Sequence, residues 1–300
     1  MNRFLFVGLL AQVVALPAYA AEFLPVAVFG EDSRVASPYR ATGKITCYFR
    51  YENNGRLRED VFAGTGNFIF SDQLADTSED IVTSAAHVFE HPDIGFIDPY
   101  RCTLTNYYAN EAIVITELDI GNLVKGPYES TREDKDDWAV IRVTGEPYGF
   151  EGVSLSSIFG SYRYMNLNRD ALDLFFEMGA SAAVVAYNRH TDTVSISRDG
   201  ELYVPEPGDV LFGSEGVWGS SHDVSRTGSG GAIILEYNGQ AIFVGHFKGS
   251  RHNLATYSEY PGDGSPHSRR DSTNIVVRSN PEFTAAIRAL SGGIVSTTED

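Results

Sequence analysis

Short apolar stretches, separated by polar and glycine-rich turns, recur along most of the chain. They are rich in β-branched and aromatic residues, a composition that is typical of β-strands. In the first half we expect strands at residues 44–49, 66–70, 81–84, 102–108, 112–118 and 138–143. In the second half we expect them at residues 183–187, 193–198, 201–204, 210–212, 232–237, 241–247 and 274–278. The pattern predicts an all-β protein.

Two segments depart from this pattern and predict helices. Residues 169–179 carry apolar side chains at a spacing that suits a short helix. Near the C-terminus, Asn280 supplies an N-cap and Pro281 the first position of a helix that runs to Leu290. The Ser-Gly-Gly sequence at 291–293 ends that helix.

The length of the chain and the distribution of its strands predict two structural units. A chain of 300 residues suffices for one large domain or two small ones. The strands fall into two sets without a sequence repeat, which indicates two small barrels or sandwiches. We place the first unit at residues 41–150 and the second, with the C-terminal helix, at residues 151–293. A tail follows at residues 294–300.

The first residues have the features of a secretory signal peptide. Arg3 precedes an apolar stretch at 4–16, and a small-x-small pattern at 18–20 predicts cleavage before Ala21. The stretch is too short for a membrane span, and no later segment reaches the required length of about 18 apolar residues. We therefore expect a signal peptide at 1–20, an N-terminal arm or short propeptide at 21–40, and export to the periplasm or the medium.

Charge and cysteine content exclude several classes of protein. The net charge of −17 argues against binding to nucleic acids or to anionic membranes. The two cysteines, Cys47 and Cys102, most simply form one disulfide in an exported chain, and two free thiols are the alternative. Neither a zinc-type Cys/His spacing nor a carboxylate cage for calcium is visible, so we expect no metal and no cofactor.

The segment 228–231 reads Gly-Ser-Gly-Gly and precedes the apolar run 232–235. Such a turn exposes the hydroxyl of Ser229 and frees neighbouring N–H groups to face a ligand. By itself the pattern is more typical of an ordinary hairpin turn.

A serine nucleophile needs a base and a group that orients the base. His87 ends the strand-like segment 81–86, and Asp137 stands directly before the apolar segment 138–141. Each residue also has a purely structural interpretation. His87 can be a half-buried histidine without function, and Asp137 can be the end of a solvated acidic loop.

The order His, Asp, Ser, with spacings of 50 and 92 residues, resembles that of the trypsin/chymotrypsin-fold serine proteases. The chain is most similar to the bacterial glutamyl endopeptidases, the V8-like group. The segments that carry this resemblance are 28–34, 64–69, 84–87, 137–140, 228–231, 244–246, 274–278 and the final helix.

The resemblance implies two six-stranded antiparallel β-barrels with the active site in the cleft between them. It further implies that Ser229 attacks a peptide carbonyl group, that His87 is the general base, and that Asp137 orients and stabilises the imidazolium. Backbone N–H groups in the segment Thr227, Gly228 and Ser229 form the oxyanion hole. The bridge between Cys47 and Cys102 would join strands on either side of the His87 loop.

Among the positions that depart from the family pattern are Thr227, Gly228, Ala232 in place of a common proline, and Val88. Thr227 replaces a glycine whose backbone angles often disfavour a β-branched residue, so we expect either a rebuilt loop or an imperfect oxyanion hole. Gly228 replaces an aspartate of the family. Activation of the enzyme through an ion pair between that aspartate and a new N-terminus is therefore excluded. Val88 stands where a cysteine often follows the histidine.

Two residues are candidates for the substrate pocket, and they point to opposite specificities. His246 matches the histidine that helps glutamyl endopeptidases to recognise an acidic side chain. Asp223, six residues before Ser229, falls where trypsin keeps the acid that selects arginine or lysine. Both also have a structural interpretation, so the prediction goes no further than an endopeptidase.

The sequence predicts a secreted serine endopeptidase that acts as a monomer on protein or peptide substrates through an acyl-enzyme. An inactive relative that binds a peptide or a protein in the same cleft is the alternative, suggested by Thr227. A β-sandwich adhesion module is a third possibility, and it would require that the candidate catalytic residues lie far apart.

Overall fold

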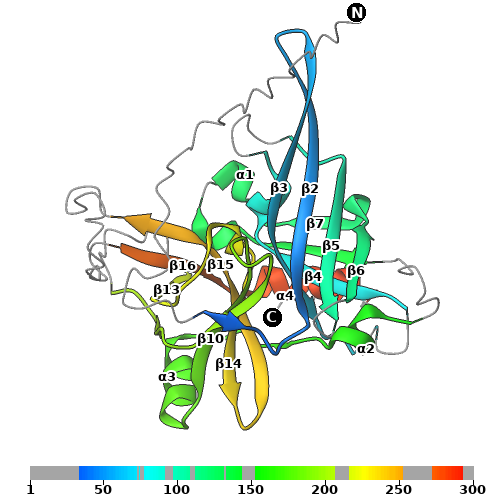
Figure 1. Cartoon of the computed structure of the whole chain (residues 1–300). Coiled ribbons are helices and arrows are strands. Elements are labelled where there is room, and N and C mark those ends of the chain that lie inside the picture. Colours follow the sequence, from blue (N-terminus) through cyan, green and yellow to red (C-terminus); the bar gives the residue numbers. More distant parts are fainter. Residues whose placement is uncertain are drawn as a thin grey trace, which may run out of the picture.

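The computed structural model describes residues 34–72, 74, 78–91, 97–108, 112–131, 133–143, 153–206, 216–252 and 272–292 (Figure 1). The predicted signal peptide, residues 21–33 of the predicted arm and the tail at 294–300 lie outside these residues. The predicted strand at 210–212 lies outside them as well.

The first sheet is built from the N-terminal half of the chain. Its strand order is β6-β5-β2-β3-β4-β8-β7, and every neighbouring pair is antiparallel. The strands are β2 (Thr42–Asn53), β3 (Arg56–Ile69), β4 (Asp80–Ser84), β5 (Arg101–Tyr108), β6 (Ala112–Leu118), β7 (Leu123–Lys125) and β8 (Ala139–Val143).

The second sheet is built mainly from the C-terminal half, with the order β1-β11-β10-β14-β15-β16-β13-β12 and β9 added in parallel to β15. Its strands are β1 (Val35–Ala36), β9 (Arg163–Tyr164), β10 (Ser181–Asn188), β11 (Thr193–Ser197), β12 (Leu202–Tyr203), β13 (Val217–Ser220), β14 (Ala232–Tyr237), β15 (Gln240–His252) and β16 (Ser272–Arg278). Because β1 pairs with β11, the described part of the chain begins on the second sheet and then forms the first.

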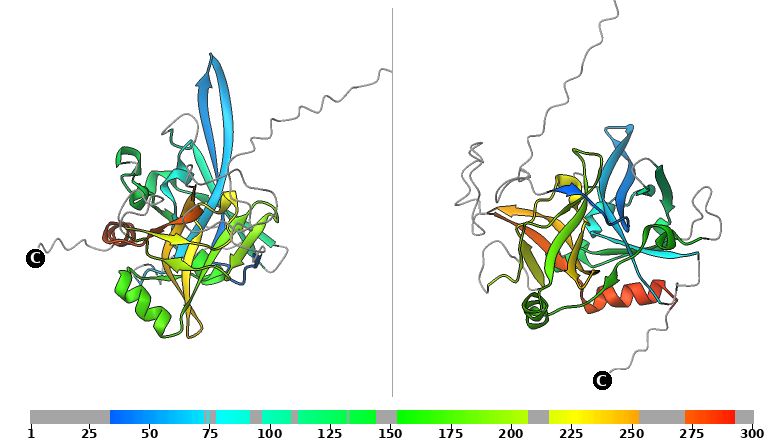
Figure 2. Two further views of the ribbon diagram at one scale, coloured as in Figure 1. Left: turned by 90° about the vertical axis from the view of Figure 1, so that its left-hand side faces the viewer. Right: turned by 60° about the horizontal axis from the view of Figure 1, so that its bottom comes forward.

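The helices are short and lie outside the sheets (Figure 2). They are α1 (Tyr128–Thr131), α2 (Leu155–Phe159), α3 (Arg169–Glu177) and α4 (Pro281–Leu290), with 3-10 turns η1 (Ala86–Phe89), η2 (Ile120–Asn122), η3 (Asp134–Asp136) and η4 (Arg226–Gly228). The predicted cap of α4 is confirmed, since the side chain of Asn280 accepts a hydrogen bond from the N–H of Phe283 at 2.7 Å. The buried Phe283 ring packs against Trp138 and Phe243, so α4 contacts both sheets.

The predicted all-β architecture with two antiparallel units is confirmed as two curled sheets, but the strand numbers differ. The sheets have seven and nine described strands instead of six each. The described strands that the sequence analysis did not predict are short: β1 and β9 have two residues each, β7 has three and β13 has four, too few for a periodic pattern in the sequence.

The hairpin of β2 and β3 is much longer than predicted and projects from the body of the protein (Figure 1). Its outer half is polar and exposed, and therefore lacks the apolar signal of a buried strand. The turn at its tip uses positive φ angles at Asn54 (53°) and Gly55 (72°). An Asn-Gly dipeptide is the strongest short-range signal of a tight hairpin turn.

The predicted disulfide between Cys47 and Cys102 is confirmed. The two residues lie directly opposite each other on β2 and β5, and both are fully buried. The bridge therefore links neighbouring strands of the sheet that carries His87 and closes a loop of 55 residues.

We expect the double replacement Cys47→Ala with Cys102→Ala to lower the free energy of unfolding by about 2–4 kcal/mol, because the unfolded chain gains conformational freedom. Urea denaturation measures this loss. The wild-type protein under reducing conditions should show a similar loss, and an unchanged stability of both samples would contradict the prediction.

Candidate active site

The pairing of β4 with β8 brings His87 to Asp137. Ser84 at the end of β4 lies opposite Ala139 at the start of β8, so the turn after one strand meets the turn before the other. His87 Nδ1 lies 2.7 Å from Oδ2 of Asp137, and the backbone N–H of His87 donates to Oδ1 at 2.9 Å. The carboxylate thus holds both the ring and the backbone of His87.

Asp137 is a buried carboxylate that remains ionised. Burial alone would raise the pKa of Asp137, but the charge and hydrogen bonds of His87 and the charge of Lys248 hold it well below its usual range. The side chain has no exposed surface. An ionised acceptor at Nδ1 fixes the tautomer of His87 and leaves Nε2 to take up a proton.

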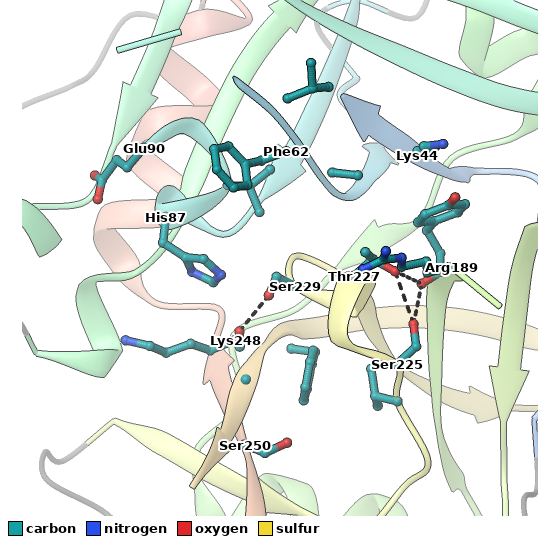
Figure 3. A pocket seen from close by; sticks show the side chains of 17 residues that line it. Lys44, Phe62, His87, Glu90, Arg189, Ser225, Thr227, Ser229, Lys248 and Ser250 are labelled. Atoms are coloured by element: carbon teal, nitrogen blue, oxygen red, sulfur yellow. Dashed lines mark hydrogen bonds between the residues drawn. The ribbon is translucent and has the colours of Figure 1, made fainter. Parts of the chain in front are cut away.

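Ser229 follows the 3-10 turn η4, and two glycines separate it from β14. It lines a cavity of about 680 Å³ together with His87, whose ring points toward it (Figure 3). In the described part of the chain, its hydroxyl donates to the backbone carbonyl of Lys248 at 3.0 Å and makes no hydrogen bond to His87. The hydroxyl proton must therefore leave the carbonyl of Lys248 before it can reach the imidazole.

The carbonyl of Lys248 is available to Ser229 because of a β-bulge. Phe247 pairs with Val276 and Gly249 with Ile275, so Lys248 is the additional residue in β15. A bulge leaves its extra residue outside the ladder and redirects its side chain.

The strand β3 holds the turn that carries Ser229. The N–H of Thr65 donates to the carbonyl of Ser229 at 2.7 Å, and the Thr65 hydroxyl donates to the carbonyl of Thr227 at 3.2 Å. The amide of Asn67 donates to the carbonyl of Gly230 at 2.7 Å. These bonds cross from the first sheet to the second and fix the position of the serine relative to His87.

Thr65 and Asn67 are the site residues that the sequence analysis missed. Both are fully buried polar residues at alternate positions of β3, on the segment 64–69 that carried part of the resemblance. Buried polar side chains require hydrogen-bond partners, so their position in an apolar strand was an available signal.

Both the backbone conformation at position 230 and the lack of room for a Cβ atom there require glycine. The φ of Gly230, +85°, lies in the region that favours glycine. A Cβ atom there would overlap the hydroxyl of Ser84 and the carbonyl of Thr65.

Thr227 and Gly228 lie in η4, so the structure has a tight turn where the family resemblance implies a glycine. The right-handed conformation of this turn is open to a β-branched residue. The N–H of Gly228 donates to the carbonyl of Ser225 at 2.8 Å and is occupied within the turn. A Cβ atom on Gly228 would overlap the side chain of Val224, which excludes an aspartate in this arrangement.

The structure does not place His246 or Asp223 in the lining of the cavity. His246 is buried, and its Nε2–H donates to the backbone carbonyl of Asp137 at 2.7 Å. Successive residues of a strand point to opposite faces, so Phe247 lines the cavity while His246 faces away from it. The N–H of Asp223 donates to Ser197 Oγ at 3.0 Å, and the neighbouring Val224 lines the cavity.

No protein-family model and no curated protein matches this sequence. Among solved structures, the fold is similar to that of the protease Anisep from Arthrobacter nicotinovorans, with a TM-score of 0.55 and 13% identity over 87% of this chain and 99% of that one. It is also similar to the thermostable serine protease AL20 from an extremophilic microorganism, with a TM-score of 0.53 and 13% identity over 84% and 97%.

At this identity the likeness establishes the fold alone. The chain has the two curled antiparallel sheets and the C-terminal helix of the trypsin-like serine protease fold, which confirms the predicted fold class. Membership of the glutamyl endopeptidase group stays a prediction.

We expect Thr65→Val to lower the free energy of unfolding by about 1–3 kcal/mol, because it removes the bond to Thr227 and the acceptor for the N–H of Tyr187. Thr83→Val on β4 is the matched control. The Thr83 hydroxyl is buried and has no hydrogen-bond partner among the described residues. Chemical denaturation measures both variants, and equal losses would show that the Thr65 bonds contribute nothing.

We also expect stability to fall with pH below neutrality. Burial lowers the pKa of His222 and of His246 to about 4 each, from 6.5, although backbone carbonyl acceptors oppose the shift. The unfolded chain therefore binds more protons between these values. This contribution to stability is fully present above pH 6.5 and is lost as the pH falls toward 4.

The expected decrease in the free energy of unfolding between pH 7 and pH 4.5 is on the order of 4 kcal/mol for the two histidines together. Denaturation at several pH values measures it. His222→Gln should remove about half of the pH dependence, whereas replacement of the exposed His190 by Gln should leave it unchanged. Equal pH dependence in both variants would contradict this assignment.

Proposed function

We propose that this chain is an exported serine endopeptidase that hydrolyses peptide bonds through an acyl-enzyme. The observation that carries the proposal is the 2.7 Å contact of the buried Asp137 with His87, which lines one cavity together with Ser229. The likeness to structures of serine proteases supports it at the level of the fold.

In the proposed reaction, the hydroxyl of Ser229 attacks the carbonyl carbon of the substrate and its proton passes to Nε2 of His87. The resulting imidazolium is stabilised by the ionised carboxylate of Asp137. His87 then donates the proton to the leaving amine, which departs and leaves the acyl group on Ser229. A water molecule, deprotonated by His87, hydrolyses this ester and restores the serine.

Backbone N–H groups of Thr227 and Ser229 are the proposed donors to the oxyanion. Gly228, the third residue of the predicted oxyanion hole, is not a proposed donor, because its N–H already donates to the carbonyl of Ser225. The bonds that Thr65 makes to the carbonyl groups of Thr227 and Ser229 restrain the peptide groups of this turn. Preorganised donors of this kind are usually the largest single contribution to such catalysis.

The cavity favours an acidic substrate over a basic one. Among the described residues, its lining contains the cations Lys44, Arg189 and Lys248 and one carboxylate, that of Glu90 (Figure 3). This charge distribution agrees with the resemblance to glutamyl endopeptidases, although His246 does not line the cavity.

Export is proposed from the predicted signal peptide and from the disulfide, which persists in oxidising compartments. Within the described residues, no helix has the length and apolar character needed to cross a membrane. A monomer remains the expectation.

A protein that binds peptides without cleaving them is the second candidate. The observation that favours it is the hydroxyl of Ser229, which is bonded to the carbonyl of Lys248 and not to His87. The occupied N–H of Gly228 in the turn points in the same direction.

Labelling of the purified mature protein with a fluorophosphonate tests the proposal. We expect labelling of the wild-type protein, and its loss in Ser229→Ala and in His87→Ala, because the hydroxyl is activated only beside the imidazole. A labelled protein should then cleave a peptide library, with acidic side chains enriched at the cleavage sites.

The absence of labelling in a correctly processed chain would overturn the endopeptidase assignment and favour the binding protein. Retention of the label in Ser229→Ala would show that a different residue is the nucleophile. Enrichment of lysine and arginine at the cleavage sites would contradict the acidic preference alone.

A further inference from the structure

Lys248 places a second cation on the carboxylate that holds His87. Its Nζ lies 3.4 Å from Oδ2 of Asp137, the same oxygen that contacts His87 Nδ1 at 2.7 Å. The backbone of Lys248 faces Ser229, while its side chain extends away from the serine (Figure 3). One bulge residue thus contacts two of the three proposed catalytic groups.

The side chain of Lys248 is held firmly in this position. Its Nζ also donates to Oδ1 of Asp134 at 2.8 Å and lies 4.0 Å from the centre of the Tyr128 ring. Only 15% of the Lys248 side chain and 2% of the Asp134 side chain are exposed. Burial would lower the pKa of Lys248, but Asp137 and Asp134 raise it above its ordinary value, so the ammonium group stays charged.

We propose that Lys248 is a positioning residue that sets the proton affinity of His87 through their shared carboxylate. The inference rests on the proposed function, since the proton accepted by His87 is the one that Ser229 releases. Nothing requires Lys248 to touch the substrate through its side chain.

The physical reason is competition for one oxygen atom. An imidazolium at His87 is stabilised by Asp137, but the neighbouring ammonium group of Lys248 already neutralises part of that charge and repels a second cation. The proton therefore binds His87 less tightly than it would beside Asp137 alone. The consequence is a neutral, reactive imidazole at lower pH than in a site without this lysine.

Asp134 acts in the opposite direction, because it neutralises part of the charge of Lys248. Among the described residues, Glu90, Asp137 and His246 interact electrostatically with His87, and these groups and Lys248 are in turn surrounded by Lys125, Tyr128, Glu129 and Asp134. Within the described part of the chain, Lys248 and His87 are the two side chains in this group that contact the carboxylate of Asp137.

The test is the titration of the His87 imidazole by NMR in a Ser229→Ala background, with the signal assigned by His87→Asn. Lys248→Gln keeps a hydrogen-bond donor but removes the charge, and should raise the titration midpoint by about 0.5 to 1 pH unit. Asp134→Asn leaves the cation with less compensation and should lower the midpoint by a similar amount. The double variant should fall between the two.

Two control variants distinguish an effect of the Lys248 charge on the titration midpoint from an effect on folding. Lys248→Arg retains the charge and should leave the midpoint near that of the parent. Lys44→Gln removes a cation from the same cavity that is paired with Asp192, and should also leave the midpoint near that of the parent. If Lys248→Gln does not fold, the direction of the midpoint shift in Asp134→Asn tests the inference: a lower midpoint supports it, and a higher or unchanged midpoint contradicts it.

Midpoints that move in opposite directions in the two variants support the inference. Shifts of the same sign, or the absence of a shift in both, would overturn it. The titration needs no catalytic activity, so its outcome is independent of fluorophosphonate labelling at Ser229. In the active background, the acid limb of kcat/KM against pH should move in the same order as the midpoints.

Discussion

Three hydrogen bonds from β3 to the turn around Ser229 determine the geometry of the candidate site. The base and its carboxylate belong to the first sheet, whereas the serine belongs to the second. The bonds from Thr65 and Asn67 join the two halves at the serine turn itself, whereas the bond from His246 to the carbonyl of Asp137 joins them beside the base. Because these groups are buried, their separation would leave polar atoms without partners, which makes the arrangement strongly favoured.

Asp137 is the electrostatic centre around which the remaining polar groups are arranged. Its carboxylate accepts hydrogen bonds from the backbone N–H and the ring of His87 and forms an ion pair with the ammonium group of Lys248. Its backbone carbonyl accepts a hydrogen bond from the ring of His246. A buried carboxylate is costly unless it is compensated in this way. The same compensation leaves little freedom for His87, so the groups that stabilise the fold here also orient the proposed base.

Much of this was predictable from the sequence, because local patterns specify strands, the cap at Asn280 and the bridge between Cys47 and Cys102. The neighbourhood of His87 and Asp137 was predictable from their motifs and order. The orientation of His246 was not, since it depends on the pairing of β15. The role of Thr65 was missed because its partners lie on the other sheet. The polar outer half of the β2–β3 hairpin carried only the signal of its Asn-Gly turn.

The β2–β3 hairpin carries one wall of the cavity well beyond the body of the protein. The strand that lines the cavity at 61–63 continues outward to the projecting tip, where the apolar Leu57 is 71% exposed (Figure 1). For the proposed endopeptidase, this extension of the cavity wall would favour substrates whose cleaved segment is locally extended over compact ones.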